Sequence, residues 1–317
     1  MVLAWSTPGA AVIAATSGIT FPEAVGAFVV TGVLLTLTGE VRPLGQMISR
    51  IPEGIAGGML AGVLLPFCLK GAGAAQHLPM VVLPMVAVFA LVRLWNPAMA
   101  VLAALVVGLT LTFGSGAAVM PDLVLTLPIP VFLLPEFRLS VLIGLALPLY
   151  LVTMASQNLP GFATMRAAGY EPPVGSALMV TGGLSTISAF FGAHPINMAA
   201  ITAAICLGDD VHPDRTQRWK VGLAYGAVWM GFGLAGPLVL AVLAVLPPEV
   251  MAALVALALV GPLLGALTVA YAQPRQRFAA TITLVVTASS VVAFGIGAAF
   301  WGLVAGLVVF GMERLRR

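Results

Sequence analysis

The stretch FGAHPINMAAITAAICLG, residues 190–207, lies in a chain that is otherwise almost continuously apolar. It places His194 directly before a proline and Asn197 two residues after it, and an Ala-rich apolar run follows. A helix that begins at membrane depth exposes unpaired backbone N–H groups and the positive end of its dipole. The stretch therefore predicts a half-helix that starts at Pro195 and Ile196 inside a bilayer.

The composition places the chain in a membrane. Of the 317 residues, 61% are hydrophobic and 8% are charged, and the mean hydropathy is +1.11. A soluble domain has roughly 25% charged residues, and the many Gly and Ala residues favour helices that pack closely in lipid. We predict an all-α polytopic membrane protein that is surrounded by the lipid bilayer and has no nucleic-acid partner.

Charges, prolines and glycine clusters divide the chain into about twelve apolar segments. They are approximately 3–17, 21–39, 54–69, 78–93, 97–117, 139–160, 173–190, 194–207, 219–246, 249–272, 278–292 and 294–312. A full span needs about 20 apolar residues. The first, eighth and eleventh segments, with the third as a borderline case, are too short to cross alone, which predicts half-helices or strongly shaped pieces. The first and eighth are expected to be half-helices, each started by a proline at mid-membrane.

The basic residues are distributed unevenly among these segments. Twelve of the 14 Lys and Arg residues follow even-numbered segments, and the other two, Lys70 and Arg138, follow odd-numbered ones. Loops rich in Lys and Arg remain on the cytoplasmic side of a membrane. The even-numbered ends and the C-terminus are therefore predicted to be cytoplasmic.

Two pairs of similar stretches indicate an internal repeat. STPGAAVIAAT (6–16) resembles AHPINMAAITA (193–203), and IPEGIAGGMLAGVLL (51–65) resembles PPEVMAALVALALVG (247–261). The first pair opens segments one and eight, and this odd difference gives the two copies opposite orientations. Inverted repeats with short, Pro-interrupted segments point to the substrate site of a secondary transporter. The alternative is that both prolines are ordinary first-turn residues near the membrane surface.

Four motifs carry a resemblance to a known family. They are AWSTPGAA (4–11), ASQNLPGFATMRAAGY (155–170), FGAHPINMAAITAAICLG (190–207) and HPDRTQRW (212–219). From its first residues to its C-terminus, the chain resembles the bacterial benzoate/proton symporters of the BenE type. This family is more distantly related to uracil and ascorbate carriers and to sulfate permeases. The resemblance implies their shared fold of fourteen spans in two inverted repeats of seven.

The resemblance also implies two domains, each built from both repeats. It assigns residues 1–50 and 138–246 to a core domain, and residues 51–137 and 247–317 to a gate domain. In the family the AWSTPGAA motif begins the third span, whereas here it begins at residue 4. The first two family spans are therefore expected to be missing, which leaves five plus seven spans and puts transport competence in question.

Candidate substrate-binding residues come from the two half-helix starts and from segment six. They are Ser6, Thr7, Gly9, Ser156, Gln157, Asn158, His194, Ile196 and Asn197. A carboxylate between two helix N-termini can accept backbone hydrogen bonds, and neutral amides can bind it without adding a buried charge. Two alternatives remain: helix capping by Ser6 and Thr7, and helix–helix hydrogen bonding by the segment-six amides.

His194 is the candidate for proton coupling. A helix N-terminus favours the neutral imidazole, and an arriving carboxylate favours the protonated one. The alternative is an ordinary structural hydrogen bond. The related uracil carriers have an acidic residue in the matching helix, whereas the positions here, around Ile201 and Thr202, are not acidic. The resemblance therefore does not supply the proton carrier.

These observations predict a secondary active transporter rather than an enzyme. We expect proton-coupled uptake of benzoate or a similar aromatic monocarboxylate across the bacterial inner membrane, with Trp5, Phe190 and Phe191 as candidates for an apolar wall. The chain contains no nucleophile–base pair, phosphate loop or dinucleotide motif, and no cofactor is expected.

Three further points stay open or are set aside. GDDVHPD (208–214) is expected to be a cytoplasmic loop rather than a metal site. A passive small-anion channel and a transport-incompetent membrane fragment are the alternative functions. The sequence leaves the oligomeric state open, with a homodimer as one option.

Overall fold

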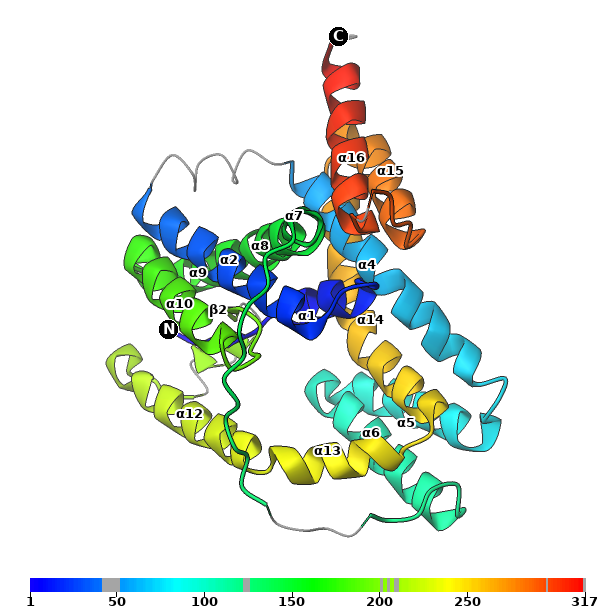
Figure 1. Cartoon of the computed structure of the whole chain (residues 1–317). Coiled ribbons are helices and arrows are strands. Elements are labelled where there is room, and N and C mark those ends of the chain that lie inside the picture. Colours follow the sequence, from blue (N-terminus) through cyan, green and yellow to red (C-terminus); the bar gives the residue numbers. More distant parts are fainter. Residues whose placement is uncertain are drawn as a thin grey trace. The chain divides into compact units, whose positions relative to one another are not determined.

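A computed structural model describes residues 1–41, 52–121, 126–199, 202–203, 206–207, 211–294 and 296–315. Within these ranges the side chains of Thr7, Ala98, Ser156, Ala163 and Ala167 are not described. The described chain is mostly helical, and its two strands, β1 (Leu3–Trp5) and β2 (Ile196–Met198), have three residues each (Figure 1). The prediction of an all-α polytopic membrane protein is confirmed.

The chain forms two compact units. Unit 1 comprises residues 1–63, 130–226 and 266–317, and unit 2 comprises residues 64–129 and 227–265. Both strands lie in unit 1. Apart from parts of helices shared with unit 2, its helices are α1 (Thr7–Ala15), α2 (Phe21–Glu40), α7 (Leu139–Val141), η1 (Leu142–Ala146), α8 (Leu147–Thr153), η2 (Met154–Asn158), α9 (Leu159–Ala167), α10 (Val174–Ala189), η3 (Arg215–Gln217), η4 (Pro274–Gln276), α15 (Arg277–Ala288) and α16 (Ala298–Leu315). Unit 2 contains α5 (Pro79–Trp95), α6 (Pro97–Gly114) and α13 (Gly236–Val245), and the helices that pass between the units are α4 (Glu53–Ala74), α12 (Trp219–Leu234) and α14 (Pro248–Ala272).

Four helices of the described chain are long and apolar enough to cross a membrane. They are α2, α4, α14 and α16, and several shorter apolar helices accompany them. Residues 139–167 form one continuous helical stretch that includes two π-helical turns, η1 and η2. Most of the apolar segments predicted from the sequence thus correspond to helices, with small differences in their ends, but residues 196–198 of the predicted segment 194–207 are extended.

The predicted segment 219–246 is an exception, because it is not a single helix. α12 and α13 meet at an angle of 57°. Pro237 lies in the first turn of α13, where its ring and its missing N–H prevent the preceding helix from continuing. The sequence therefore located the apolar stretch correctly but not its bend.

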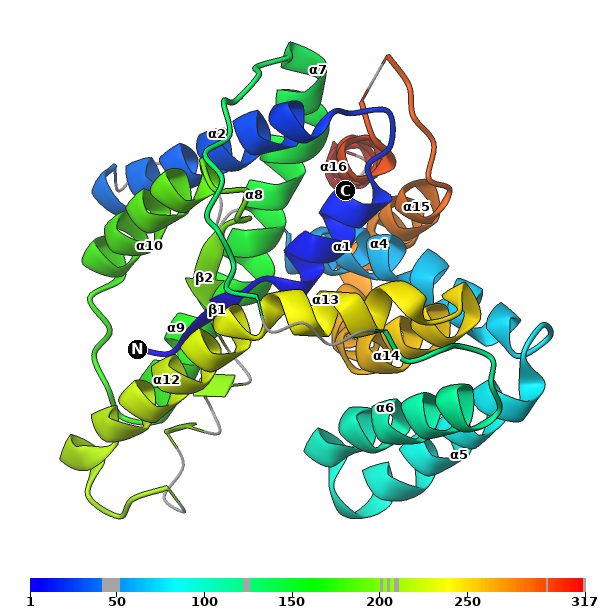
Figure 2. The same ribbon diagram turned by 60° about the horizontal axis from the view of Figure 1, so that its bottom comes forward.

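α2 and α10 pack side by side in unit 1, as both Figure 1 and Figure 2 show. The contact depends on glycine. A Cβ added at Gly182 would collide with the backbone of Thr36, and one added at Gly32 would lie 2.5 Å from the Thr186 Oγ1. Small residues of this kind allow helix backbones to approach closely in lipid. The pairing of α2 with α10 therefore holds together two segments that are far apart in the sequence.

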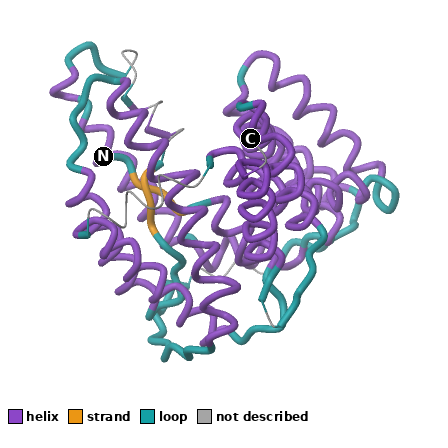
Figure 3. The backbone as a smooth tube through the Cα atoms, turned by 90° about the horizontal axis from the view of Figure 1, so that it is seen from above, coloured by secondary structure: helices purple, strands orange, loops and turns teal. Residues whose placement is uncertain are grey.

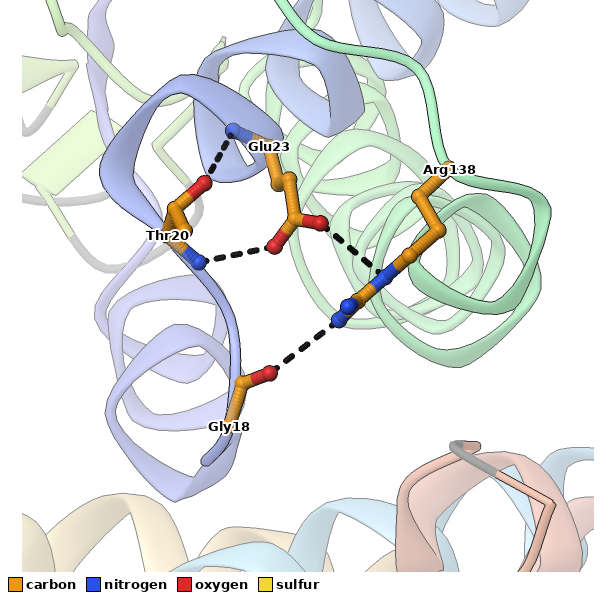
Figure 4. A network of polar contacts seen from close by, with 4 residues as sticks. All are labelled: Gly18, Thr20, Glu23 and Arg138. Carbon is orange, nitrogen blue, oxygen red and sulfur yellow. Dashed lines mark hydrogen bonds and ion pairs between the residues drawn. The ribbon is translucent and has the colours of Figure 1, made fainter.

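The N-terminus of α2 is closed by a polar network (Figure 4). Thr20 and Glu23 form a reciprocal capping box, in which the Thr20 N–H donates to a Glu23 carboxylate oxygen at 2.8 Å. The other carboxylate oxygen is 3.0 Å from the Nε of Arg138, which also donates to the Gly18 carbonyl at 3.1 Å. This network ties the start of α2 to the residue that precedes α7.

An extended segment, residues 130–138, leads to that arginine within unit 1. The Leu133 N–H donates to the Phe190 carbonyl at 2.7 Å, and the Glu136 N–H donates to the Pro22 carbonyl at 3.0 Å. The ring of Phe132 stacks on Phe190, with centroids 5.5 Å apart. The segment therefore fastens the end of α10 to the start of α2.

Unit 2 has its own apolar core, built around α5 and α6. Its fully buried members include Met85, Ala100 and Ala104, and residues of α14 such as Val250 complete it. The core contains aliphatic, methionine and aromatic side chains and no charged group among its buried members. Within this unit α5 and α6 form a helical hairpin, in which they lie against each other (Figure 2).

Candidate functional site

The site is organised by the pairing of β1 with β2. The strands run antiparallel, with Ala4 opposite Asn197 and Trp5 opposite Ile196. Figure 3 shows the two strands lying together between helices of unit 1. The pair brings the two Pro-containing motifs, which are distant in the sequence, into direct contact.

The start of α1 is capped internally. Ser6 is the N-cap, and its hydroxyl oxygen accepts a hydrogen bond from the Gly9 N–H at 2.8 Å. Pro8 stands in the first turn, where a missing N–H costs nothing. With the Asn197 amide oriented to suit its neighbours, its oxygen accepts from the Ser6 N–H at 3.0 Å and its nitrogen donates to the Met198 carbonyl at 2.8 Å. Capping by Ser6 is therefore present, and Asn197 links α1 to β2.

The second half-helix does not begin at Pro195, so this prediction was wrong. Residues 196–198 are extended as β2. The Ala203 N–H donates to the Ala199 carbonyl at 3.0 Å, and the Leu207 N–H donates to the Ala203 carbonyl at 2.9 Å. Helical bonding therefore starts after Met198. The reason is tertiary, since pairing with β1 satisfies an extended conformation that the local sequence does not specify.

The edge of β2 that faces away from β1 is also hydrogen-bonded. The Ile196 N–H donates to the Ser185 hydroxyl oxygen at 2.8 Å, and the Met198 N–H donates to the Asn158 Oδ1 at 2.9 Å. Ser185 and Asn158 are both fully buried. Ser185 is not predicted by the sequence, because one serine in a run of small residues on α10 gives no indication of its partner.

The three polar residues of segment six lie in the π-helical turn η2. Gln157 is half-buried and makes no hydrogen bond with another described residue. Asn158 instead has its oxygen on β2 and its nitrogen 3.4 Å from the Met154 Sδ. The side chain of Ser156 lies outside the described residues, as does that of Thr7 in α1. π-Helical turns occur frequently at functional sites.

His194 lies in the turn between α10 and β2. Its imidazole ring contacts the indole of Trp5, with centroids 6.0 Å apart and planes tilted by 48°. The Nδ1 atom is buried and makes no hydrogen bond of normal geometry with a described group. A buried polar atom without a partner is uncommon in native proteins and calls for an explanation.

The far end of the second half-helix is held by Arg218. This side chain is buried, and it donates from Nη1 to the Leu207 carbonyl and from Nε to the His212 carbonyl. A cation at a helix C-terminus satisfies unpaired carbonyls and complements the helix dipole. The HPDRTQRW motif therefore contributes an anchor through Arg218, a role that the sequence pattern did not predict.

The predicted aromatic wall is divided between two places. Trp5 contacts His194. Phe190 and Phe191 both contact Phe132 of the extended segment, at centroid distances of 5.5 and 6.0 Å. The structure thus brings one of the three predicted rings to the histidine.

No group of three or more His, Cys, Asp or Glu residues suited to a metal ion is found among the described residues. Residues 208–210 of the GDDVHPD stretch lie outside them. In the described part of that loop, Asp214 bonds the N–H and hydroxyl of Thr216 at 2.9 and 2.8 Å. Cys68 and Cys206 are free thiols. The Asp214 hydrogen bonds are therefore local to the loop, and the two cysteines are packing residues.

A polytopic bundle of apolar helices, with two short strands paired between them, defines this chain as a helical membrane protein. The chain belongs to the BenE family, described as benzoate membrane transport proteins, whose profile matches residues 1–312.

Two curated relatives align over 311 residues, which is 98% of this chain. The inner membrane protein YdcO of Escherichia coli K12 is 38% identical, over 80% of its own length. The benzoate membrane transport protein of Acinetobacter baylyi is 32% identical, over 79% of its length. The resemblance found in the sequence motifs is confirmed, and the chain is identified as a membrane transport protein.

Proposed function

We propose that this protein carries benzoate or a similar aromatic monocarboxylate across the membrane together with a proton. The substrate class follows from the family and from the relative that is named a benzoate transport protein. The observation that carries the coupling is the buried Nδ1 of His194 beside the paired strands, which makes no hydrogen bond of normal geometry with a described group. The charge of a histidine can change near neutral pH, and a carboxylate bound beside the ring would favour the protonated form.

Coupling to a proton has a clear electrical advantage. The entry of an anion alone, against an inside-negative potential of about 100 mV, costs about 2.3 kcal/mol of free energy. A proton that moves with the anion cancels its charge. Lys and Arg residues are absent from positions 1–41, 139–165 and 174–207. In our proposal the proton therefore neutralises the charge of the anion in place of a permanent cation at the strand pair.

The substrate carboxylate is proposed to bind beside His194, with the uncommitted amide of Gln157 as a second hydrogen-bonding group. Both side chains are half-buried, which suits a site that is reached from water in part of a transport cycle. Trp5 supplies an apolar face next to the imidazole. Ser6, Gly9 and Asn197 hydrogen-bond to one another at the strand pair, and we propose that they form a wall of the site.

The protein is further proposed to reside in the inner membrane, like the relative YdcO, with its C-terminus in the cytoplasm. The orientation is supported by the uneven distribution of Lys and Arg. A green fluorescent protein fused after Arg317 is expected to fluoresce, and alkaline phosphatase at the same position is expected to be inactive. The reverse pattern would contradict the proposed orientation.

Uptake into proteoliposomes tests the function. An inward proton gradient should drive accumulation of radiolabelled benzoate above that of uracil or sulfate, and a protonophore should abolish it. Benzoate flux that is unaffected by the proton gradient would indicate a passive channel instead. Absence of benzoate flux would contradict the assignment.

A further inference from the structure

The outward edge of β2 carries two backbone donors that the strand pair does not use. In an antiparallel pair, alternate residues bond across the ladder and the residues between them point their N–H groups outward. The Ala199 N–H bonds the Val2 carbonyl at 3.1 Å. With Ala4 opposite Asn197, the alternation directs the N–H groups of Ile196 and Met198 away from β1.

Ser185 of α10 binds the first of these donors. Its hydroxyl donates to the Thr181 carbonyl at 2.6 Å and accepts from the Ile196 N–H at 2.8 Å. The Thr181 carbonyl is the nearer acceptor for the hydroxyl proton, since the Ile196 carbonyl is 3.4 Å away, and the oxygen remains an acceptor for the strand. The side chain is 0% exposed. Ser185 therefore touches the strand rather than a solute.

Asn158 of η2 binds the second donor from another helix. Its Oδ1 accepts from the Met198 N–H at 2.9 Å, and its side chain is 0% exposed. Gly161, one turn further on, has no side chain where the Cβ of Met198 packs, and a Cβ there would lie only 2.6 Å away. The helix therefore approaches this strand closely at the point where Asn158 reaches it.

We propose that Ser185 and Asn158 are positioning residues that hold β2, and with it His194, at the place where the substrate binds. They act through the backbone of Ile196 and Met198 and do not contact the substrate. This assigns Asn158 a different role from direct substrate binding. The inference rests on the proposed function for its transport readout, but its hydrogen bonds can be tested without transport.

Ser185→Ala removes the acceptor for the Ile196 N–H, and Ser185→Thr retains it. Ser188→Ala is a matched control, since the one bond of the Ser188 hydroxyl among the described residues goes to a carbonyl of its own helix, that of Ser185. We expect Ser185→Ala to raise the apparent KM for benzoate about tenfold, as for one lost buried hydrogen bond, with Vmax changed less than about twofold. Ser185→Thr should restore KM, and Ser188→Ala should match the wild type.

Asn158→Leu removes the other acceptor at similar volume and is expected to raise KM in the same way. Because both residues hold one strand, the double variant should be less impaired than the product of the single effects. If Ser185→Ala does not fold, Ser185→Cys is the second variant, since a thiol is a poor acceptor. An unchanged KM in both folded single variants, or fully multiplicative effects, would overturn the proposal.

Residue-resolved amide hydrogen exchange tests the bonds directly and independently of transport. Exchange at Ile196 should accelerate about tenfold or more in Ser185→Ala, and exchange at Met198 should do so in Asn158→Leu. Wild-type exchange rates in these variants would overturn the proposal even where benzoate is transported. Conversely, exchange could be faster in the variants while the wild-type protein moves no benzoate. That result would support the positioning contacts and refute the proposed function alone.

Discussion

The indole of Trp5 lies against the imidazole of His194, with ring centroids 6.0 Å apart. This contact joins the residue at the end of β1 to the turn that precedes β2. Protonated imidazole quenches indole fluorescence more strongly than neutral imidazole does. The pair therefore provides an optical reporter of the proposed proton site.

In a variant whose other tryptophans are replaced by phenylalanine, Trp5 emission should fall as the pH is lowered through the titration of His194. Benzoate should shift the midpoint of this titration upward, because a bound carboxylate favours the imidazolium. The same variant carrying His194→Gln is the control and should show no such titration. A benzoate-independent midpoint would contradict a carboxylate bound beside His194.

Two adjacent glycines of α10 provide a stability test. Gly182→Ala places a methyl group against the Thr36 backbone, whereas a Cβ at Gly183 meets nothing within 4 Å. We expect Gly182→Ala to destabilise the protein by about 2 kcal/mol or more through overpacking. Gly183→Ala should be neutral or stabilise it by up to about 1 kcal/mol. Thermal unfolding in detergent measures both, and equal midpoints would contradict the close α2–α10 contact.

The network at Glu23 predicts that two substitutions, one at each end of the ion pair, destabilise the protein to different extents. Glu23→Gln keeps an acceptor for the Thr20 N–H and loses the ion pair with Arg138, which is half exposed. It should cost about 0.5–1 kcal/mol, because the Arg138 end of the pair is half exposed and the neutral amide of Gln leaves no buried charge without a partner. Arg138→Met should cost more, because it leaves the buried carboxylate of Glu23 without its cation. Thermal midpoints in the opposite order would contradict the network.

Asp214 predicts a pH dependence in the loop before α12. The hydroxyl and N–H of Thr216 donate to its carboxylate and hold the pKa of Asp214 below its usual value. A lowered folded-state pKa gives stability that is present above the unfolded pKa of about 4 and is lost as the pH falls through the folded value.

Asp214→Ala should therefore lower the thermal midpoint slightly at about pH 7, and this difference from the wild type should vanish below the folded pKa. Asp214→Asn, which keeps an acceptor oxygen, should lie between the two at about pH 7. A difference that grows as the pH falls would contradict the assignment.

The sequence predicted most of the fold because hydropathy and prolines mark helices locally. It located the apolar segments and the half-helix that starts at Pro8, and Ser6 caps that helix as one of the two interpretations expected. It did not predict β2. An extended conformation at Ile196 depends on β1 and on Ser185, neither of which the local pattern reveals.

The sequence likewise predicted some residues of the candidate site and not others. His194 and Asn197 stand out because polar groups are rare in an apolar stretch, and both lie at the strand pair. Ser185 does not stand out, because a serine on a helix in lipid usually bonds its own backbone. The π-helical turn that directs Asn158 to β2 is likewise a tertiary feature.

Benzoate flux through His194→Gln in proteoliposomes tests the central claim most directly. The substitution keeps a hydrogen-bond donor and removes the titration. The proposed mechanism predicts that exchange of labelled for unlabelled benzoate persists at equal pH on both sides, because it needs no net proton movement. Net accumulation driven by an inward proton gradient should be lost. Accumulation equal to that of the wild type would show that the coupled proton is carried by another group, and would contradict the role of His194.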